Sequence, residues 1–280
     1  MGEISAELVR ELREETGLGM MECKKALVDA DGDKKKAVRL LRERGSLTAQ
    51  KKSTRAANQG LVVSFSKPDG KAGSLVEVNC ETDFVARNET FVGFVNGLAE
   101  KACDSDASLA ETEREGLVAL VAKLGENMLI RRNARFVISG AGMVMSYIHL
   151  GAKIGVLVDA GCGTEAAAQS DAFKDAVKDV AMHIAATNPL CLNREAVPAS
   201  IAASEREIFA KQVQDKPANI VDKIVDGKMK KFYAESCLLE QGFVKDPKQS
   251  VTQYLEAKGK GIGDTITIRR YLRFQVGQKD

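Results

Sequence analysis

The sequence predicts a mixed α+β protein in which one module of two strands and a helix occurs twice. Near residue 60 the hydrophobic pattern changes from the helical spacing of the N-terminal segment to runs that are typical of strands. A predicted hairpin followed by a predicted helix then appears, and the same order recurs about eighty residues later. Two further helical patterns precede the last predicted strand, which indicates an inserted antiparallel helical hairpin.

The composition is that of a globular protein and argues against several classes. Its 280 residues are enough for two or three packed units. The net charge of +2 is too small to indicate a nucleic-acid or membrane-surface partner. No apolar run reaches the roughly eighteen residues of a membrane span, and the N-terminus lacks the basic start and apolar core of a secretion signal.

The cysteine pattern indicates free thiols in a reducing cytosol. The sequence contains no C-x-x-C pair, and with two histidines it offers no zinc-binding spacing. A structural disulfide is therefore not expected. The six scattered cysteines are Cys23, Cys80, Cys103, Cys162, Cys191 and Cys237.

Residues 1 to 45 are predicted to form three short helices. Ser5 is expected to cap the first helix, and Gly17 and Gly19 to end it. Asp33 is expected to cap the third helix, which is predicted to stop at Gly45. Fewer than about fifty residues make a small core, so tertiary contacts are expected to support this unit.

The second of these helices carries two adjacent methionines. Met20, Cys23 and Leu27 are expected to share one apolar stripe. Met20 and Met21 lie about 100° apart on a helix, so they cannot face the same way, and one of them is expected in the core. For the neighbouring Lys24, the alternative to a binding role is a solvated helix face.

Residues 46–59 are polar and basic and are predicted to be a linker. A local RNA-binding patch is a weaker alternative, because no aromatic residue stands among these charges. The strands and helices of the two modules then follow from alternation and from helical spacing. In the first module they are strands 61–66 and 74–78, helices 91–101 and 112–124, and strand-like segments 128–132 and 135–138.

The second module is predicted from strands 143–149 and 154–158 and a helix that starts near Asp171. The inserted hairpin is expected to consist of helices 198–214 and 218–235, joined at residues 215–217. A helix over 250–258 and a strand over 265–276 follow, and this strand is expected to complete the second sheet.

The turn between strand and helix in the first module is the candidate functional segment. Phe84 and Val85 stand there between charged residues, on a loop of the sort that usually faces water. The common alternative is that Phe84 folds back under the following helix. The second module has residues 160–164 at the corresponding place and no Phe, which suggests that this loop carries function while the rest carries fold.

Residues 82–87 also resemble the signature of the elongation factor Ts family, the nucleotide exchange factors of the GTPase elongation factor Tu. Three further segments match the family in its own order: residues 16–27, His149 with residues 151–158, and residues 227–232. Each match alone is weak, but the four together span almost the whole chain and are specific.

The resemblance implies a domain arrangement. It predicts a UBA-like three-helix domain at 1–50, a linker at 51–59 and an N-terminal core subdomain at 60–140. The C-terminal core subdomain is expected at 141–190 and 236–280, interrupted by a helical hairpin at 191–235. Longer family members continue beyond the last strand into a further helix that adds to the GTPase contact.

The resemblance also implies a mechanism and a set of partner-binding residues. The family binds GDP-loaded elongation factor Tu, inserts the Asp83–Phe84 loop near the Mg²⁺ site, promotes GDP release and stabilises the nucleotide-free GTPase until GTP binds. Phe84 is then the wedge, and Arg87 is expected to brace the loop. For His149 the alternative is a plain strand-end histidine. The implied residues are Thr82, Asp83, Phe84, Val85, Ala86 and Arg87 in the loop, Met20, Met21 and Lys24 in the N-terminal helices, and His149 and Gly151 in the second module.

No enzymatic chemistry, cofactor or metal is expected, because the sequence has neither a G-x-x-x-x-G-K-[ST] loop nor a G-x-S-x-G elbow. Elongation factor Tu is the expected partner, with no nucleic acid and no membrane, in the cytoplasm. A dimer or a 2:2 complex stays open. Two rival functions are a UBA-type adaptor that uses the N-terminal helices alone and an RNA-binding protein that uses the basic pairs at 51–52, 131–132 and 230–231.

Overall fold

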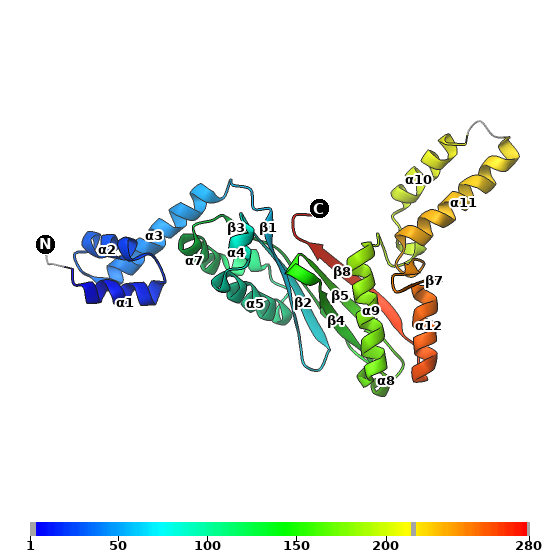
Figure 1. The fold of residues 1–280 in the computed structure, drawn as a ribbon, viewed down its shortest axis with the longest axis horizontal. Coiled ribbons are helices and arrows are strands. Elements are labelled where there is room, and N and C mark those ends of the chain that lie inside the picture. Colours follow the sequence, from blue (N-terminus) through cyan, green and yellow to red (C-terminus); the bar gives the residue numbers. More distant parts are fainter. Residues whose placement is uncertain (1–3, 214–216, 279–280) are drawn as a thin grey trace. The chain divides into compact units, whose positions relative to one another are not determined.

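The computed structural model describes residues 4–213 and 217–278 (Figure 1). The chain forms two compact units. Unit 1 comprises Met1–Val63, Leu75–Arg135 and Gln275–Asp280, and unit 2 comprises Ser64–Ser74 and Phe136–Phe274. Helices and small sheets occur together, so the predicted α+β class is confirmed. The finer division into five domains stays a prediction.

Two three-stranded sheets form the centre of the described fold. The last strand pairs with β5, as expected for a strand that completes the second sheet. β4 and β5 are antiparallel, with Gly142 opposite Gly161 and Ile148 opposite Gly155. The strand orders are β1 (Gln59–Ser66), β2 (Ala72–Cys80), β3 (Met128–Val137) and β4 (Gly142–Ile148), β5 (Ile154–Gly161), β8 (Thr267–Gln275).

The N-terminal segment folds into the three expected helices, α1 (Ala6–Thr16), α2 (Met20–Asp29) and α3 (Lys34–Lys52). Ser5 caps α1, because its side chain accepts the N–H of Leu8 at 3.2 Å. Asp33 caps α3 in the same way. The buried residues of this small core are Val9, Leu12, Cys23, Ala26, Leu27, Ala30, Ala37 and Leu41.

The prediction that the third helix stops at Gly45 is wrong, because α3 continues to Lys52. Gly45 is buried where α3 packs against α7 (Arg114–Leu124), and a Cβ at this position would lie 3.2 Å from the Cβ of Ala122. A glycine inside a helix costs about 1 kcal/mol relative to alanine, but here it lets the two helices approach closely. The coil of the predicted 51–59 linker is accordingly shorter, and it begins after Lys52.

The duplicated module is larger than the sequence pattern indicated. In both copies two strands lead to a one-turn helix, a long helix, a third helix and a third strand. The third helix ends in both copies at a glycine with positive φ, Gly125 (74°) and Gly263 (68°), which is a common way to terminate a helix. The helices are α4 (Asp83–Ala86), α5 (Glu89–Asp104) and α7 in the first copy, and α8 (Glu165–Gln169), α9 (Asp171–Thr187) and α12 (Val251–Ile262) in the second.

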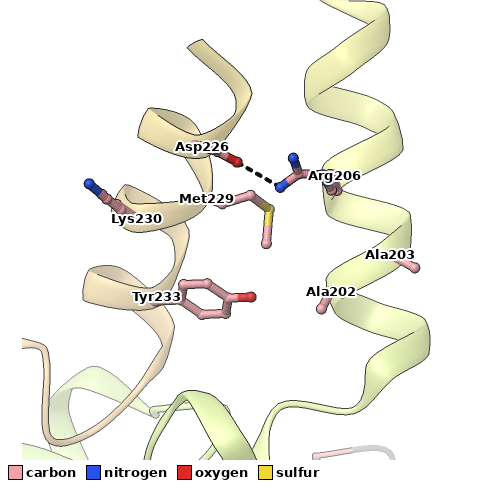
Figure 2. A pocket seen from close by; sticks show the side chains of 7 residues that line it. All are labelled: Ala202, Ala203, Arg206, Asp226, Met229, Lys230 and Tyr233. Carbon is pink, nitrogen blue, oxygen red and sulfur yellow. Dashed lines mark hydrogen bonds and ion pairs between the residues drawn. The ribbon is translucent and has the colours of Figure 1, made fainter. Parts of the chain in front are cut away.

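The helical hairpin of α10 (Ala199–Lys211) and α11 (Ala218–Ser236) lies between α9 and α12 in the sequence. Its two helices run side by side (Figure 1) and enclose their own apolar cluster around Val225 and Met229. Figure 2 shows their facing sides, where Arg206 and Asp226 form an ion pair at 2.8 Å above Met229. The expected junction around residue 215 falls outside the described residues. A short two-stranded sheet, β6 (Gly242–Phe243) with β7 (Asp246–Ser250), precedes α12.

A buried histidine supports the fold of unit 2. His183 lies on α9, is fully buried, and its Nδ1 accepts the N–H of Val244 at 3.1 Å. This bond leaves Nε2 as the protonated ring nitrogen, which donates to Gln241 Oε1 at 2.9 Å. The imidazole is therefore neutral, and burial lowers the pKa of His183 below its ordinary value.

This burial predicts that acidification destabilises the protein. Since the folded pKa of His183 lies below the value of 6.5 in the unfolded chain, the unfolded state binds the extra proton first, and stability falls as the pH drops below 6.5. We expect the free energy of urea unfolding to decrease between about pH 7.5 and pH 5.5. His183→Gln should flatten this dependence. His149→Gln should leave it intact, and a flat profile in the unmodified chain would contradict the assignment.

Candidate functional site

The segment that follows β2 is organised around Thr82, which caps the one-turn helix α4. The Thr82 side chain accepts the N–H of Val85 at 3.3 Å, and its carbonyl oxygen accepts the N–H of Ala86 at 3.2 Å. Ala86 is buried, so one side of the turn faces the core. The remaining side chains of residues 82–87, the exchange loop, are half-buried or exposed.

A carboxylate from another element fixes the start of this loop. Glu126 follows α7 and accepts two hydrogen bonds from Thr82, one from the backbone N–H at 3.0 Å and one from the hydroxyl at 2.7 Å. Beside it, Glu81 Oε1 accepts the N–H of Asn127 at 2.6 Å. Charge-assisted hydrogen bonds of this kind are stronger than neutral ones. The exchange loop is thus tied to the connection between α7 and β3.

Phe84 projects from this fixed loop into solvent, with 82% of its surface exposed. The alternative in which Phe84 folds back under the following helix is wrong. Phe91 of α5 occupies the buried aromatic position instead and has no exposed surface. A large exposed aromatic side chain on an ordered loop is a typical feature of a protein-binding site.

Asp83 and Arg87 flank Phe84 in the sequence and pair with each other. The Arg87 guanidinium lies 3.1 Å from the Asp83 carboxylate, one helical turn away. This pair spans α4, which agrees with the expected bracing role of Arg87. Because 81% of the Arg87 side chain is exposed, a partner with its own charged groups can compete for either member of the pair.

The second copy of the module contains the same anchor. Thr164 caps α8, and its hydroxyl donates to Asp264 Oδ2 at 2.8 Å. The N–H of Gly163 donates to Asp264 Oδ1 at the same distance. The hydrogen bond from Thr164, with those from the backbone of Thr265 and Gly163, holds the pKa of Asp264 below its usual value. Asp264 follows α12 as Glu126 follows α7.

The two loops differ in the side chain that they present. Two residues beyond the capping threonine, the first copy has Phe84 and the second has Ala166. Cys80 and Cys162 agree again, since each thiol donates to the carbonyl oxygen of that threonine, at 3.1 and 3.2 Å. A conserved anchor with one exposed aromatic ring added to it indicates that the ring, rather than the scaffold, distinguishes the first copy.

The methionines of α2 are both exposed, Met20 by 53% and Met21 by 75%, so the expectation that one of them is core is wrong. Met20 is the first residue of α2, and helical side chains point back toward the N-terminus, where no further turn covers it. Lys24 is also exposed, and Val28 is an exposed apolar residue one turn beyond it that the sequence analysis did not single out. We call Met20, Met21, Lys24 and Val28 the α2 face.

His149 lies at the end of β4, where the turn to β5 begins. Its Nδ1 lies 3.1 Å from the hydroxyl of Tyr147. The next residue, Leu150, is 89% exposed, more than Phe84, and was missed because nothing in a single sequence separates a Leu that is presented from one that is packed. Gly151 and Ala152 both have positive φ, 80° and 53°, which is unusual for Ala.

The candidate residues are distributed over both units. Unit 1 contains the exchange loop and the α2 face, on different elements, and unit 2 contains the turn of His149, Leu150 and Gly151. All six cysteines are free thiols. In the part of the chain that the structure describes, no helix has the length and apolarity needed to cross a membrane.

Comparisons with known proteins agree on one family. The family model described as elongation factor TS matches residues 81–278. A protein from Clostridium kluyveri that is named Elongation factor Ts is 47% identical over 98% of this chain and 93% of its own length. Proteins of the same name from Clostridium botulinum and Clostridium perfringens are each 45% identical, with the same coverage of both chains.

Proposed function

The chain belongs to the elongation factor Ts family, and from this premise we propose that it is the guanine-nucleotide exchange factor of elongation factor Tu in translation. It binds the GDP-loaded GTPase, promotes GDP release and stabilises the nucleotide-free state until GTP binds. The observation that carries this proposal is the exposed ring of Phe84 on an anchored loop. The activity requires no bond-making chemistry, cofactor or membrane, and its setting is the cytoplasm.

Exchange follows from a difference in affinity. A factor that prefers the nucleotide-free GTPase must weaken nucleotide binding by the same factor, because the two binding equilibria are linked. Converting a rare state into the dominant one takes about 5.5 kcal/mol of differential affinity. Burial of one Phe side chain supplies roughly 1.5–3 kcal/mol. Phe84 therefore needs additional contacts from the rest of the chain.

The exchange loop is suited to acting as a wedge. Its backbone is fixed by Glu126 and by the cap of α4, so little conformational entropy is lost when Phe84 enters a partner. We propose that Phe84 inserts beside the Mg²⁺ site of the GTPase and that Asp83 accompanies it. Opening of its pair with Arg87 would free the Asp83 carboxylate for a group of the partner.

Two further surfaces are proposed to supply the remaining affinity. The α2 face offers two exposed methionines beside Lys24, and methionine adapts its shape readily to a partner. The β4–β5 turn presents His149, Gly151 and the exposed Leu150. Contacts spread over several modules suit an interface that has to supply several kcal/mol.

The proposal is tested by mixing the protein with elongation factor Tu that carries a fluorescent GDP analogue. Stopped-flow fluorescence in the presence of excess unlabelled GDP measures the release rate. We expect the rate to increase with the concentration of this protein and then to saturate. A release rate equal to that of elongation factor Tu alone, at concentrations where a complex forms, would overturn the proposed function.

The α2 face gives a separate prediction. We expect the double substitution Met20→Ala and Met21→Ala to raise the dissociation constant for nucleotide-free elongation factor Tu by about tenfold or more, since each methionine loses apolar contact area. The release rate at saturation should change less, because the exchange loop is intact. Isothermal titration calorimetry measures the affinity. Leu47→Ala, an exposed apolar residue of α3, is the control and should bind normally.

A further inference from the structure

Two cysteines face each other where the helical hairpin leaves unit 2 and returns to it. Cys191 precedes α10, and Cys237 is the C-terminal cap of α11. The two residues form a parallel β-bridge, and their sulfur atoms lie 3.7 Å apart. Hydrogen bonds on either side keep the two segments together, from Leu190 N–H to the Ser236 carbonyl at 2.8 Å and from Leu238 N–H to the Cys191 carbonyl at 2.9 Å.

The backbone at this place has the spacing that a disulfide needs. Neighbouring strands lie about 4.7–4.9 Å apart, and disulfides join Cα atoms that are about 4.4–6.8 Å apart. A bond between the two sulfur atoms would therefore require side-chain rotation more than movement of the backbone. The sequence offered no hint of this pair, because the two cysteines are separated by the whole hairpin.

The two thiols differ in their surroundings, and this difference sets an order of reaction. Cys191 is half-buried and its thiol donates to the carbonyl oxygen of Asn193 at 3.2 Å. Cys237 is buried, and burial, followed by its hydrogen bond with Cys191, raises the pKa of Cys237 to about 12. The thiol of Cys237 thus stays protonated and can donate to a thiolate on Cys191. The first nucleophile is Cys191.

We propose that Cys191 and Cys237 form a reversible dithiol site whose oxidant is a small-molecule disulfide. The Cys191 thiolate attacks one sulfur of that disulfide, and the other sulfur leaves as a thiolate. Cys237 then attacks the Cys191 sulfur of the mixed disulfide and displaces the second thiolate. The protons of the two cysteine thiols pass to the two released thiolates, so the external disulfide is reduced while one disulfide forms in the protein.

Oxidation would close the base of the helical hairpin covalently. The hairpin is connected to the rest of unit 2 through the segments that carry these two cysteines. In the reduced protein, backbone hydrogen bonds hold these segments together, whereas a disulfide would keep them together even when those bonds open. A small-molecule thiol would restore the dithiol by the reverse exchange.

The test uses the full chain and oxidised glutathione as the oxidant. We expect the intact mass to fall by about 2 Da, the loss of two hydrogens, as expected for an internal disulfide. Trypsin digestion without reductant should then leave peptides 179–194 and 232–245 joined, and dithiothreitol should separate them. This measurement needs no elongation factor Tu, so its outcome is independent of the proposed exchange activity.

A matched control is available in the second module. Cys162 is also half-buried, and its thiol also donates to a carbonyl oxygen two residues on, at 3.2 Å. Cys162→Ser should keep the mass loss, whereas Cys191→Ser should abolish it, with circular dichroism showing that both variants are folded. Persistent glutathione adducts on Cys191, disulfide-linked dimers, or unchanged thiols in the folded chain would each overturn the proposal.

Discussion

Replacing Phe84 by Ala will slow the release of GDP from elongation factor Tu by about 10- to 100-fold. The ring is 82% exposed in the free protein, so its burial in a partner supplies roughly 1.5–3 kcal/mol, and each 1.36 kcal/mol corresponds to a factor of ten in rate. We expect the affinity for the nucleotide-free GTPase to fall less, because the α2 face and the β4–β5 turn remain. Stopped-flow release and equilibrium titration measure the two quantities separately.

Two controls separate a specific wedge from general hydrophobicity. Val244→Ala shortens another exposed apolar residue and should leave the release rate unchanged. Ala166→Phe, combined with Phe84→Ala, places a ring at the matching position of the second copy and should not restore exchange. If Phe84→Ala releases GDP at the unmodified rate, the wedge has to be abandoned.

Replacing Glu126 by Ala will both destabilise the protein and slow exchange. The substitution removes the acceptor of two hydrogen bonds from Thr82, and hydrogen bonds to a charged group contribute about 1.5–3 kcal/mol to the free energy of unfolding. Without this anchor the loop is no longer held in one position, and we expect GDP release to slow by about tenfold through lost preorganisation. Urea unfolding and stopped-flow release measure the two effects.

Asp264→Ala is the matched control for this prediction, because Asp264 holds Thr164 as Glu126 holds Thr82. It should lower stability as well, yet the loop that it frees carries Ala166 in place of an aromatic ring. We therefore expect the GDP release rate to stay close to that of the unmodified chain. Equal slowing by Glu126→Ala and Asp264→Ala would mean that the effect comes from lost stability and not from the exchange loop.

Much of the fold was predictable because its signals are local. The caps Ser5 and Asp33 and the hairpin-plus-helix pattern depend on residues that are close in sequence. The errors came from contacts between distant segments. Gly45 looks like a helix terminator, but α3 continues through it because α7 packs against it. Met20 fits the apolar stripe of α2, but the small core ends before it.

The sequence by itself determined the α+β class, the repeat, the family and the loop that contains Phe84, because periodicity and short motifs are written in neighbouring residues. Only the tertiary structure decided that Phe84 faces solvent, since exposure depends on whether Phe91 or Phe84 fills the core. It also decided that Glu126 anchors the loop and that Cys191 meets Cys237. Such pairs are far apart along the chain, and only folding brings their atoms within bonding distance.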